Sequence, residues 1–437
     1  MVGPLDEAAP RSHLRPLRAW RGVRPWRLVG DILKALILGG GFAGTTVAHL
    51  LHREGWETTL VEREPHLGGG CRTFFHAGHP FTYGPRLYYG YSEKVFSWVN
   101  GIVPIRRFPF ELKTLAHEPN DEDRRFWTYP PHELDLGSYP RAAQIAKELA
   151  ERDNTKEPQD FDEYYRQKVG PTLYEMFTDH YSRKMWSIDS NKVFDTFRWS
   201  AKDKPIESGT RDAYKGSYIG YPIPKDAYNG YFERMVEGTE VILGKHATWY
   251  PEHESILVDS VEASRRSMMS ARELPADVII STIPIDELVG EEGALPYAGR
   301  DFHLVVLPTK EVFPGDVRFC HYASPRDEWT RITEFKKITW HESESTLLVL
   351  EKPSKANKLY PYLTKANMAK VDQYLKMLPP NVHSIGRLGT YKYSTIEQTI
   401  VQAFELAAKL TGKPNEIQGE WRGIGDTSMM KDRKEAA

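Results

Sequence analysis

The sequence predicts an α/β protein that also carries an inserted helical domain and an antiparallel β-sheet domain. Three observations predict this organisation. The apolar run Leu36–Leu38 is followed by the glycine-rich stretch Gly39–Gly44, a helix and a second strand that ends at Glu62. Apolar residues recur at helical spacing between Arg141 and Trp186. A second strand-rich part extends from about Val241 to Val349.

The first of these segments is typical of a Rossmann-like dinucleotide-binding domain. In the pattern G-x-G-x-x-G, Gly39 allows the tight turn, Gly41 lets the backbone approach a pyrophosphate, and Gly44 lets the helix pack on the strand. The turn also contains Phe42 and Ala43, and it places the pyrophosphate at a helix N-terminus. Glu62, at the end of the second strand, is the predicted partner of the ribose hydroxyls.

The next segment favours a flavin over a nicotinamide cofactor. Residues 65–72 read P-H-L-G-G-G-C-R, and such a glycine pair followed by an arginine is typical of FAD-binding folds. Gly69 and Gly70 allow a second close approach to the cofactor, and Arg72 supplies positive charge. Arg72 as an ordinary surface residue is the alternative interpretation.

The composition excludes several classes of protein. The 58 Lys and Arg residues and 60 Asp and Glu residues give a net charge of −2, which indicates no nucleic-acid partner. The two cysteines, Cys71 and Cys320, cannot form a disulfide scaffold or a four-thiolate metal site, so we expect no metal and a cytoplasmic protein. The segment Leu33–Leu51 contains four glycines within six residues and is rejected as a membrane span.

Five parts of the chain are predicted. The first is a disordered basic leader, for which an arm that binds an acidic partner is the alternative, and the last is a polar tail. The predicted parts are the leader (1–33), the FAD-binding domain (34–100, 228–300 and 381–412), the antiparallel substrate domain (101–135, 198–227 and 301–350), the helical substrate domain (136–197) and the tail (413–437).

Together these segments resemble the UDP-galactopyranose mutase family over most of 34–410. The stretch Gly386–Tyr393 (G-R-L-G-T-Y-K-Y) is the most specific single match. The other matching segments are the flavin turn Gly39–Gly44, the loop Tyr83–Tyr89, the helical segment from Val169 to Trp186 with Tyr181 and Lys184, the turn Pro284–Asp286, and the strand with Arg331, Glu334 and Lys336.

The resemblance implies a mutase that uses reduced FAD as a nucleophile. The flavin N5 attacks the anomeric carbon of a nucleotide sugar and displaces the nucleoside diphosphate, and the sugar recloses through a different hydroxyl. NAD(P)H or another reductant must first reduce the flavin. No net oxidation occurs, so the enzyme is an isomerase.

The resemblance also implies roles for particular residues. Arg331 and, more loosely, Arg198 would bind the diphosphate, Tyr360 and Tyr393 would donate hydrogen bonds to it, and Trp186 would form a wall of the sugar site. The residues expected to bind FAD are Gly39, Gly41, Phe42, Ala43, Gly44, Glu62, Arg63, Gly69, Gly70, Arg72, Pro85, Arg86, Leu87, Arg387, Thr395, Ile396, Glu397 and Gln398.

The departures from the family pattern concern the flavin's reactive end and the nucleotide. Arg86 replaces the histidine of the family's Gly-Pro-His loop, and Thr395 replaces an acidic residue. Changes at Asp226–Tyr228 and Leu359–Tyr360 favour a GDP-linked, galactose-type hexose such as GDP-galactose over a UDP-linked one. Tyr218, Tyr221 and Tyr228 are the candidates for stacking on a purine.

Two other functions stay open. An amine-oxidase-like or desaturase-like FAD oxidoreductase would share the signals of the first 90 residues but would not need Arg331, Trp186 or the 386–393 segment. A catalytically inactive flavin-binding regulator is the third hypothesis, because Arg86 cannot exchange a proton near neutral pH. The base, the sugar and the oligomeric state are left open, with a homodimer as one candidate.

Overall fold

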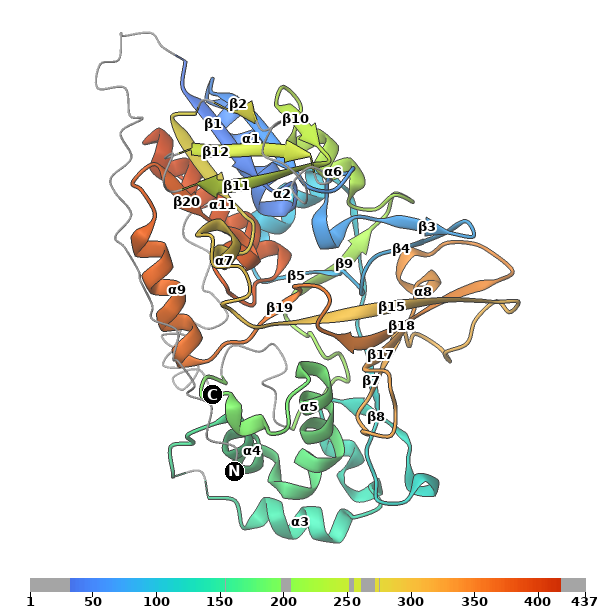
Figure 1. Cartoon of the computed structure of the whole chain (residues 1–437). Helices are drawn as coiled ribbons and strands as arrows, with labels where there is room; N and C mark the ends of the chain where they lie inside the picture. The colour runs from blue at the N-terminus through green and yellow to red at the C-terminus, as the bar shows by residue number, and fades with distance from the viewer. Residues whose placement is uncertain are drawn as a thin grey trace, which may run out of the picture.

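A computed structural model describes residues 32–153, 155–197, 206–250, 255–260, 272–274 and 276–417 (Figure 1). The predicted leader, apart from its last two residues, lies outside the described residues, as do Arg198 and most of the tail. Within the described part, the sequence-distant strands and helices assemble into a parallel sheet, a large antiparallel sheet and a helical region.

A five-stranded parallel sheet forms the first layer, with the strand order β10-β2-β1-β14-β20. The central strand, β1, is buried after its first residue because it pairs with β2 on one side and β14 on the other. The strands come from three separate stretches of the chain. They are β1 (Lys34–Leu38), β2 (Glu57–Glu62), β10 (Glu240–Leu243), β14 (Val278–Ser281) and β20 (Val382–Ser384).

Helices cover both faces of this sheet. The side chains of β1, which alternate between the two faces, therefore pack into two different cores. Ala35 and Ile37 pack into a core with residues of α1 and α11, whereas Leu36 and Leu38 pack with residues of α7 and α9. The predicted domain boundaries left α9 unassigned, although it belongs to this domain's core. The four helices are α1 (Phe42–Arg53), α7 (Ile285–Leu288), α9 (Lys365–Met377) and α11 (Ile396–Thr411).

A seven-stranded sheet, with the order β19-β15-β18-β17-β16-β7-β8, lies beside the parallel sheet (Figure 1). Its strands pair antiparallel except for β16 and β7. A charged segment at 120–125 lies in the connection from β7 to β8. The strands are β7 (Leu112–Leu115), β8 (Phe126–Tyr129), β15 (Tyr297–Leu307), β16 (Phe319–Tyr322), β17 (Arg331–Glu334), β18 (Thr346–Ser354) and β19 (Tyr360–Pro361).

The helical region predicted between Arg141 and Trp186 consists of separate helices. Gly170 has a φ of +81°, and Pro171 lacks a backbone donor, so α4 is kinked there. A non-helical stretch follows α3, and a π-helical turn at Glu175–Asp179 precedes α5. The helices are α3 (Ala142–Ala150), α4 (Phe161–Tyr174) and α5 (His180–Trp186).

Smaller elements connect these three regions. Strands β5, β9 and β6 form a three-stranded antiparallel sheet, and α2 and α6 pack against each other. The connecting elements are β3 (Phe74–His76), β4 (His79–Phe81), β5 (Tyr88–Gly90), α2 (Glu93–Ile102), β6 (Ile105–Arg107), β9 (Tyr218–Pro222), α6 (Asn229–Met235), β11 (Lys245–Tyr250), β12 (Ser255–Ser260), β13 (Arg272–Glu273), α8 (Lys336–Thr339) and α10 (Gly386–Gly389).

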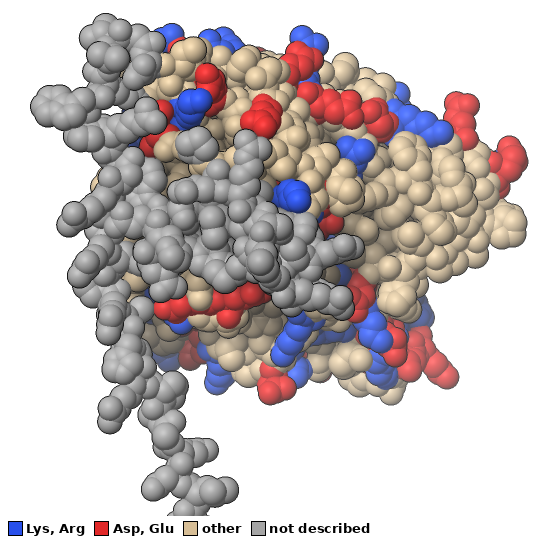
Figure 2. All heavy atoms as spheres, turned by 45° about the horizontal axis from the view of Figure 1, so that its top comes forward, with Lys and Arg blue, Asp and Glu red and all other residues tan. Residues whose placement is uncertain are grey.

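The surface carries both signs of charge. Figure 2 shows acidic and basic side chains interspersed on the face that it presents, without a broad field of one sign among the described residues. None of the helices in the described part of the chain combines the length and the apolar character that a membrane crossing requires.

Candidate active site

Two glycine loops form a cradle at the carboxyl end of β1. A Cβ on Gly44 would overlap the carbonyl oxygen of Gly39, so Gly44 serves close helix–strand packing, as predicted. Gly41, the N-cap of α1, faces open space, and a Cβ added to it would meet no atom within 4 Å. The second loop lies opposite, because the Gly68 N–H donates to the Gly40 carbonyl at 2.8 Å and Gly69 faces Gly41. The opening at Gly41 fits a diphosphate at a helix N-terminus.

Glu62 is buried at the end of β2 and holds the first loop. Its Oε2 accepts a hydrogen bond from the Gly40 N–H at 2.6 Å, and its Oε1 accepts one from the Glu64 N–H at 2.8 Å. A carboxylate has about four lone-pair positions, so it can still accept from a ribose hydroxyl. Arg63 instead points to the surface, where it pairs with Glu64 at 3.6 Å.

Arg86 joins the second glycine loop to the loop before β5. Its Nε donates to the Gly70 carbonyl at 2.9 Å. Pro85 and Leu87 flank it and are half-buried, and Arg72 ends the short helical turn at Gly69–Cys71. The predicted FAD-binding residues of both loops therefore lie together at one edge of the parallel sheet.

Arg331 reaches the same region from the antiparallel sheet. A Cβ on Gly84 would lie 3.2 Å from its Nη2, so the loop before Arg86 passes next to this guanidinium. The Nε and Nη2 of Arg331 donate to the two carboxylate oxygens of Glu351 at 2.7 and 2.8 Å. Glu351 is 1% exposed, and it offsets the charge of Arg331.

Two tyrosines and two further arginines complete this cluster. Tyr360 and Tyr393 stack with ring centroids 5.8 Å apart. The Arg300 guanidinium lies 5.0 Å from the Tyr360 ring centroid, and that of Arg387 lies 4.9 Å from the Tyr393 ring centroid. Trp186 packs edge-on against Tyr360 at 6.2 Å. Four of the five predicted catalytic residues are thus brought together, and the fifth, Arg198, lies outside the described residues.

The charges around Tyr360 give the two tyrosines different pKa values. Burial alone would raise the pKa of Tyr360, but the nearby guanidinium groups of Arg86, Arg300 and Arg331 hold it below its ordinary value. Burial and the neighbouring Tyr360 raise the pKa of Tyr393. Tyr393 therefore keeps its proton to higher pH than Tyr360 does.

The side chains of other residues predicted to bind FAD form hydrogen bonds with neighbouring groups of the protein. The Nε and Nη2 of Arg387 both donate to the Ser394 carbonyl, at 3.1 and 2.6 Å. Thr395 and Gln398 form a reciprocal capping box at the start of α11. The first backbone N–H groups of α11, such as that of Ile396, have no carbonyl partner within the helix and point along its axis, as at any helix N-terminus.

Glu397, also predicted to bind FAD, is buried against β5 and α2. Its carboxylate accepts hydrogen bonds from the Tyr88 hydroxyl at 3.1 Å and from the N–H groups of Tyr91 and Ser92 at 2.9 and 3.0 Å. Burial raises its pKa, although these donors oppose the shift. Its side chain joins α11 to β5 and α2.

An apolar pocket lies on the other side of Trp186, between α4 and α5. It contains a buried hydroxyl, the Ser182 Oγ, which has no hydrogen-bond partner among the described residues. Such a group favours a polar ligand atom nearby. The pocket residues are Tyr129, Phe161, Tyr165, Phe177, Thr178, Tyr181, Ser182, Met185, Trp186 and Tyr393.

The tyrosines proposed to stack on a purine do not line this pocket. Tyr221 and Tyr228 are fully buried, and Tyr228 packs edge-on against Phe42 at 5.3 Å. Tyr218 stacks on Phe96 at 4.7 Å, beside the Arg107 guanidinium. That expectation is wrong for Tyr221 and Tyr228, because their rings fill the core behind α1.

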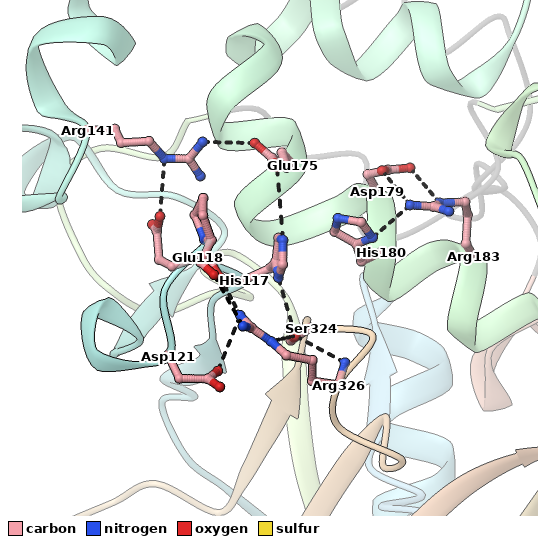
Figure 3. A network of polar contacts seen from close by, with 11 residues as sticks. His117, Glu118, Asp121, Arg141, Glu175, Asp179, His180, Arg183, Ser324 and Arg326 are labelled. Carbon is pink, nitrogen blue, oxygen red and sulfur yellow. Dashed lines mark hydrogen bonds and ion pairs between the residues drawn. The ribbon is translucent and has the colours of Figure 1, made fainter.

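Three side chains elsewhere could offer ligand atoms to a metal ion. His117, Glu175 and His180 present atoms within 4.8 Å of one another (Figure 3). However, the Arg183 guanidinium contacts the His180 Nδ1 at 2.7 Å, which places the proton of neutral His180 on its other nitrogen. Arg141 also pairs with Glu175 at 2.8 Å. These arginines favour a polar network over a divalent cation.

Fold and site together define a class: an α/β dinucleotide-binding enzyme with a cationic, tyrosine-rich site beside its glycine loops. Two family models match the chain, the NAD(P)-binding Rossmann-like domain over residues 37–102 and UDP-galactopyranose mutase over residues 176–393. The chain belongs to the UDP-galactopyranose mutase family, and as a member of a family of mutases it is an isomerase.

Curated relatives match along most of the chain. A protein named a probable UDP-galactopyranose mutase, from Klebsiella pneumoniae, is 26% identical over 85% of this chain and 93% of its own length. A dTDP-fucopyranose mutase from Escherichia coli is 27% identical over 86% of this chain and 97% of its own length. A phytoene desaturase from Phycomyces blakesleeanus is 45% identical, but over only 12% of this chain.

Solved structures share the fold. A reduced UDP-galactopyranose mutase has a TM-score of 0.73 and 15% identity, over 91% of this chain and 98% of the other. A putrescine oxidase has a TM-score of 0.52 and 12% identity, over 88% of this chain and 100% of the other. Mutases and amine oxidases thus share this architecture, so the fold alone does not separate them.

Proposed function

We propose that this protein uses reduced FAD to interconvert the pyranose and furanose forms of a nucleoside-diphosphate hexose. One arrangement carries the proposal: Arg331, Tyr360 and Tyr393 meet beside the loop that Arg86 ties to the glycine cradle. This arrangement supports the proposal, because the three side chains would offer donors to a diphosphate next to the predicted flavin position. An amine substrate has no diphosphate to accept these hydrogen bonds.

The residues present fit FAD. The cradle at Gly41 and Gly69 would take the diphosphate, Glu62 would accept from the ribose, and the N-terminus of α11 would face the flavin ring. When bound and reduced, FAD supplies a nucleophilic nitrogen for the anomeric carbon.

The chain's own residues would orient and release the diphosphate. Because Glu351 fixes the guanidinium of Arg331, the arginine offers its remaining N–H groups in one direction. The hydroxyls of Tyr360 and Tyr393 would donate to phosphate oxygens. Arg86, Arg300 and Arg387 would stabilise the negative charge that develops on the leaving group.

The base would bind at the apolar pocket, within reach of the Ser182 hydroxyl, and Tyr181 and Phe177 would have to move apart to admit it, because the cavity is only about 30 Å³. A pyrimidine is the leading candidate, since two curated relatives are named for UDP- and dTDP-linked sugars. A guanine is the second candidate, favoured by the sequence departures at Asp226–Tyr228 and Leu359–Tyr360.

The test is turnover by the FAD-loaded protein with UDP-, dTDP- and GDP-linked hexoses, followed by chromatography of the pyranose and furanose products. Dithionite-reduced enzyme should interconvert one of them without consuming oxidant, whereas oxidised enzyme should not. Equal rates for the oxidised and reduced forms would reject the proposal. Oxygen consumption with an amine substrate would favour the oxidase alternative.

A further inference from the structure

Lys184 is surrounded by backbone carbonyl groups. Its Nζ donates to the carbonyl oxygens of Tyr322, Ser324, Asp327 and Trp329, at 2.8, 2.8, 3.0 and 2.8 Å. An ammonium group has three hydrogens and no acceptor, so four carbonyls satisfy it fully. A buried charge is tolerated only where such partners are present.

All four carbonyls belong to the end of β16 or to the loop between β16 and β17. That loop ends immediately before Arg331, the first residue of β17. The ammonium group therefore fixes the conformation of the segment that leads to the predicted diphosphate arginine.

Lys184 itself lies on α5, between Tyr181 of the apolar pocket and Trp186 of the sugar site. The next two residues of α5 are also held through their carbonyls. The Met185 carbonyl accepts from the Arg300 Nη1 at 3.0 Å, and the Trp186 carbonyl accepts from the Tyr362 hydroxyl. The C-terminal turn of α5 is thus attached to three separate segments.

Further polar contacts join the β16–β17 loop to the segment that follows β7 (Figure 3). The His117 Nδ1 lies 3.3 Å from the Ser324 Oγ, and the Arg326 Nη1 donates to the Pro119 carbonyl at 3.2 Å. These contacts are partly exposed and do not involve α5. Lys184 is the side chain of α5 that donates to four carbonyls of the segment leading to Arg331.

We propose that Lys184 is a positioning residue that holds Tyr181 and Trp186 at the correct distance from Arg331 for nucleotide binding. This inference rests on the proposed function. It assigns Lys184 no contact with the substrate, only the alignment of two walls of the site. A methionine would fill the same apolar volume but remove the donor that these four carbonyls share.

The experiment compares Lys184→Ala with the wild type and with Lys310→Ala. Lys310 is a matched control because it is an exposed lysine that pairs with Glu344 at 3.1 Å, away from the β16–β17 loop. The readouts are FAD content and the affinities for UDP, dTDP and GDP. They are measured near pH 7, about one unit below the pKa of about 8 to which burial lowers Lys184.

We expect Lys184→Ala to keep its FAD and to bind the preferred diphosphate about tenfold or more weakly. Ammonium or potassium ions should restore much of this affinity, because a carbonyl cage can replace a cation's hydration shell. Tetramethylammonium, at equal ionic strength, is too large and should not restore it. Lys184→Met should show the same loss without rescue, since its side chain fills the cage.

Unchanged affinity in Lys184→Ala, or a loss that ammonium does not reverse, would overturn the inference. Loss of FAD from both the alanine and the methionine variants would also overturn it, because the lysine would then maintain the fold as a whole. If the wild type binds none of the three diphosphates, the proposed function fails instead.

Discussion

Arg331 and Glu351 lie directly opposite each other in the β17–β18 pair, and the carboxylate binds two nitrogens of the guanidinium. The pair is inside the protein, with Glu351 at 1% exposure. The guanidinium is consequently a fixed donor whose net charge is already compensated. Arg331 would therefore bind a diphosphate through the fixed direction of its N–H groups more than through its net charge.

Arg331→Ala should therefore have two separable effects. Removing one partner of a buried pair leaves Glu351 charged and unpaired, which should lower the free energy of unfolding by about 3–5 kcal/mol. Adding Glu351→Gln should restore part of that loss. Chemical denaturation of the single and double variants measures this difference.

In the same variants the diphosphate affinity should not follow the stability. Loss of a charge-assisted hydrogen bond of about 1.5–3 kcal/mol should weaken binding roughly 10- to 150-fold in both the single and the double variant. Lys310→Ala, which removes only the exposed pair with Glu344, should change neither property. If the double variant regained full affinity, Arg331 would not be a diphosphate ligand.

Gly41→Val should release FAD without unfolding the protein. A Cβ at this position meets no atom within 4 Å, so the side chain has room in the apoprotein and only obstructs a ligand. A valine at an N-cap costs about 1 kcal/mol of stability. The flavin absorbance of the purified protein measures its FAD content, and thermal unfolding measures its stability.

Gly101→Val is the matched control for this change, since Gly101 in α2 also faces open space. It should keep its FAD. Gly44→Ala should instead unfold the domain, because the added carbon would overlap the Gly39 carbonyl. A Gly41→Val protein with full FAD content would show that the diphosphate binds elsewhere.

The parallel sheet and glycine cradle could be predicted because their signals are local. Gly39, Gly44 and Glu62 follow one another within a single strand–helix–strand unit, and the contacts between Gly44 and Gly39 and between Glu62 and Gly40 lie within that unit. The kink in α4 has a local signal, Gly170 followed by Pro171. The placement of α9 depends instead on packing between segments far apart in the chain.

The partners of the predicted site residues were harder to predict. Glu351 was missed, although its place opposite Arg331 follows once β17 and β18 are aligned as a hairpin pair. Glu397 was predicted near the flavin from its position at the start of α11. Its carboxylate contacts Tyr88, Tyr91 and Ser92 instead, and sequence alone does not reveal amides that lie so far from it along the chain.

Diphosphate binding should weaken as the pH rises toward 10. Burial would raise the pKa of Tyr360, but the Arg86, Arg300 and Arg331 guanidinium groups outweigh it, so this phenol ionises below its ordinary pKa and loses its donor hydrogen. The lowered pKa also makes the free energy of unfolding rise with pH between that pKa and about 10. In this range the unfolded chain keeps the Tyr360 proton that the folded protein has lost. Affinity and stability should thus change in opposite directions.

Titration of the diphosphate across this pH range, for wild type and two variants, checks the assignment. Tyr360→Phe should bind more weakly at neutral pH and lack the decline. Tyr393→Phe should bind more weakly but retain the decline, because burial raises the pKa of Tyr393. A decline that persists in Tyr360→Phe would assign it to another group.

Replacement of Arg86 should lower the reduction potential of the bound flavin. Arg86 carries a permanent positive charge, and its Nε is held on the Gly70 carbonyl at 2.9 Å, between the glycine cradle and the site of Arg331. A fixed cation near the flavin favours the anionic reduced form that the proposed reaction requires. Removing about 1–2 kcal/mol of this stabilisation corresponds to roughly 20–45 mV for a two-electron couple.

A spectroscopic redox titration of three variants measures this effect of Arg86. Arg86→Gln should show the full decrease, and Arg86→His should show a smaller one at acidic pH, where the imidazole is charged. Arg106→Gln is the control, because Arg106 stacks on Trp340 at 4.5 Å in a different part of the molecule. An unchanged potential in Arg86→Gln would place this arginine away from the flavin and leave its contact with Gly70 as its role.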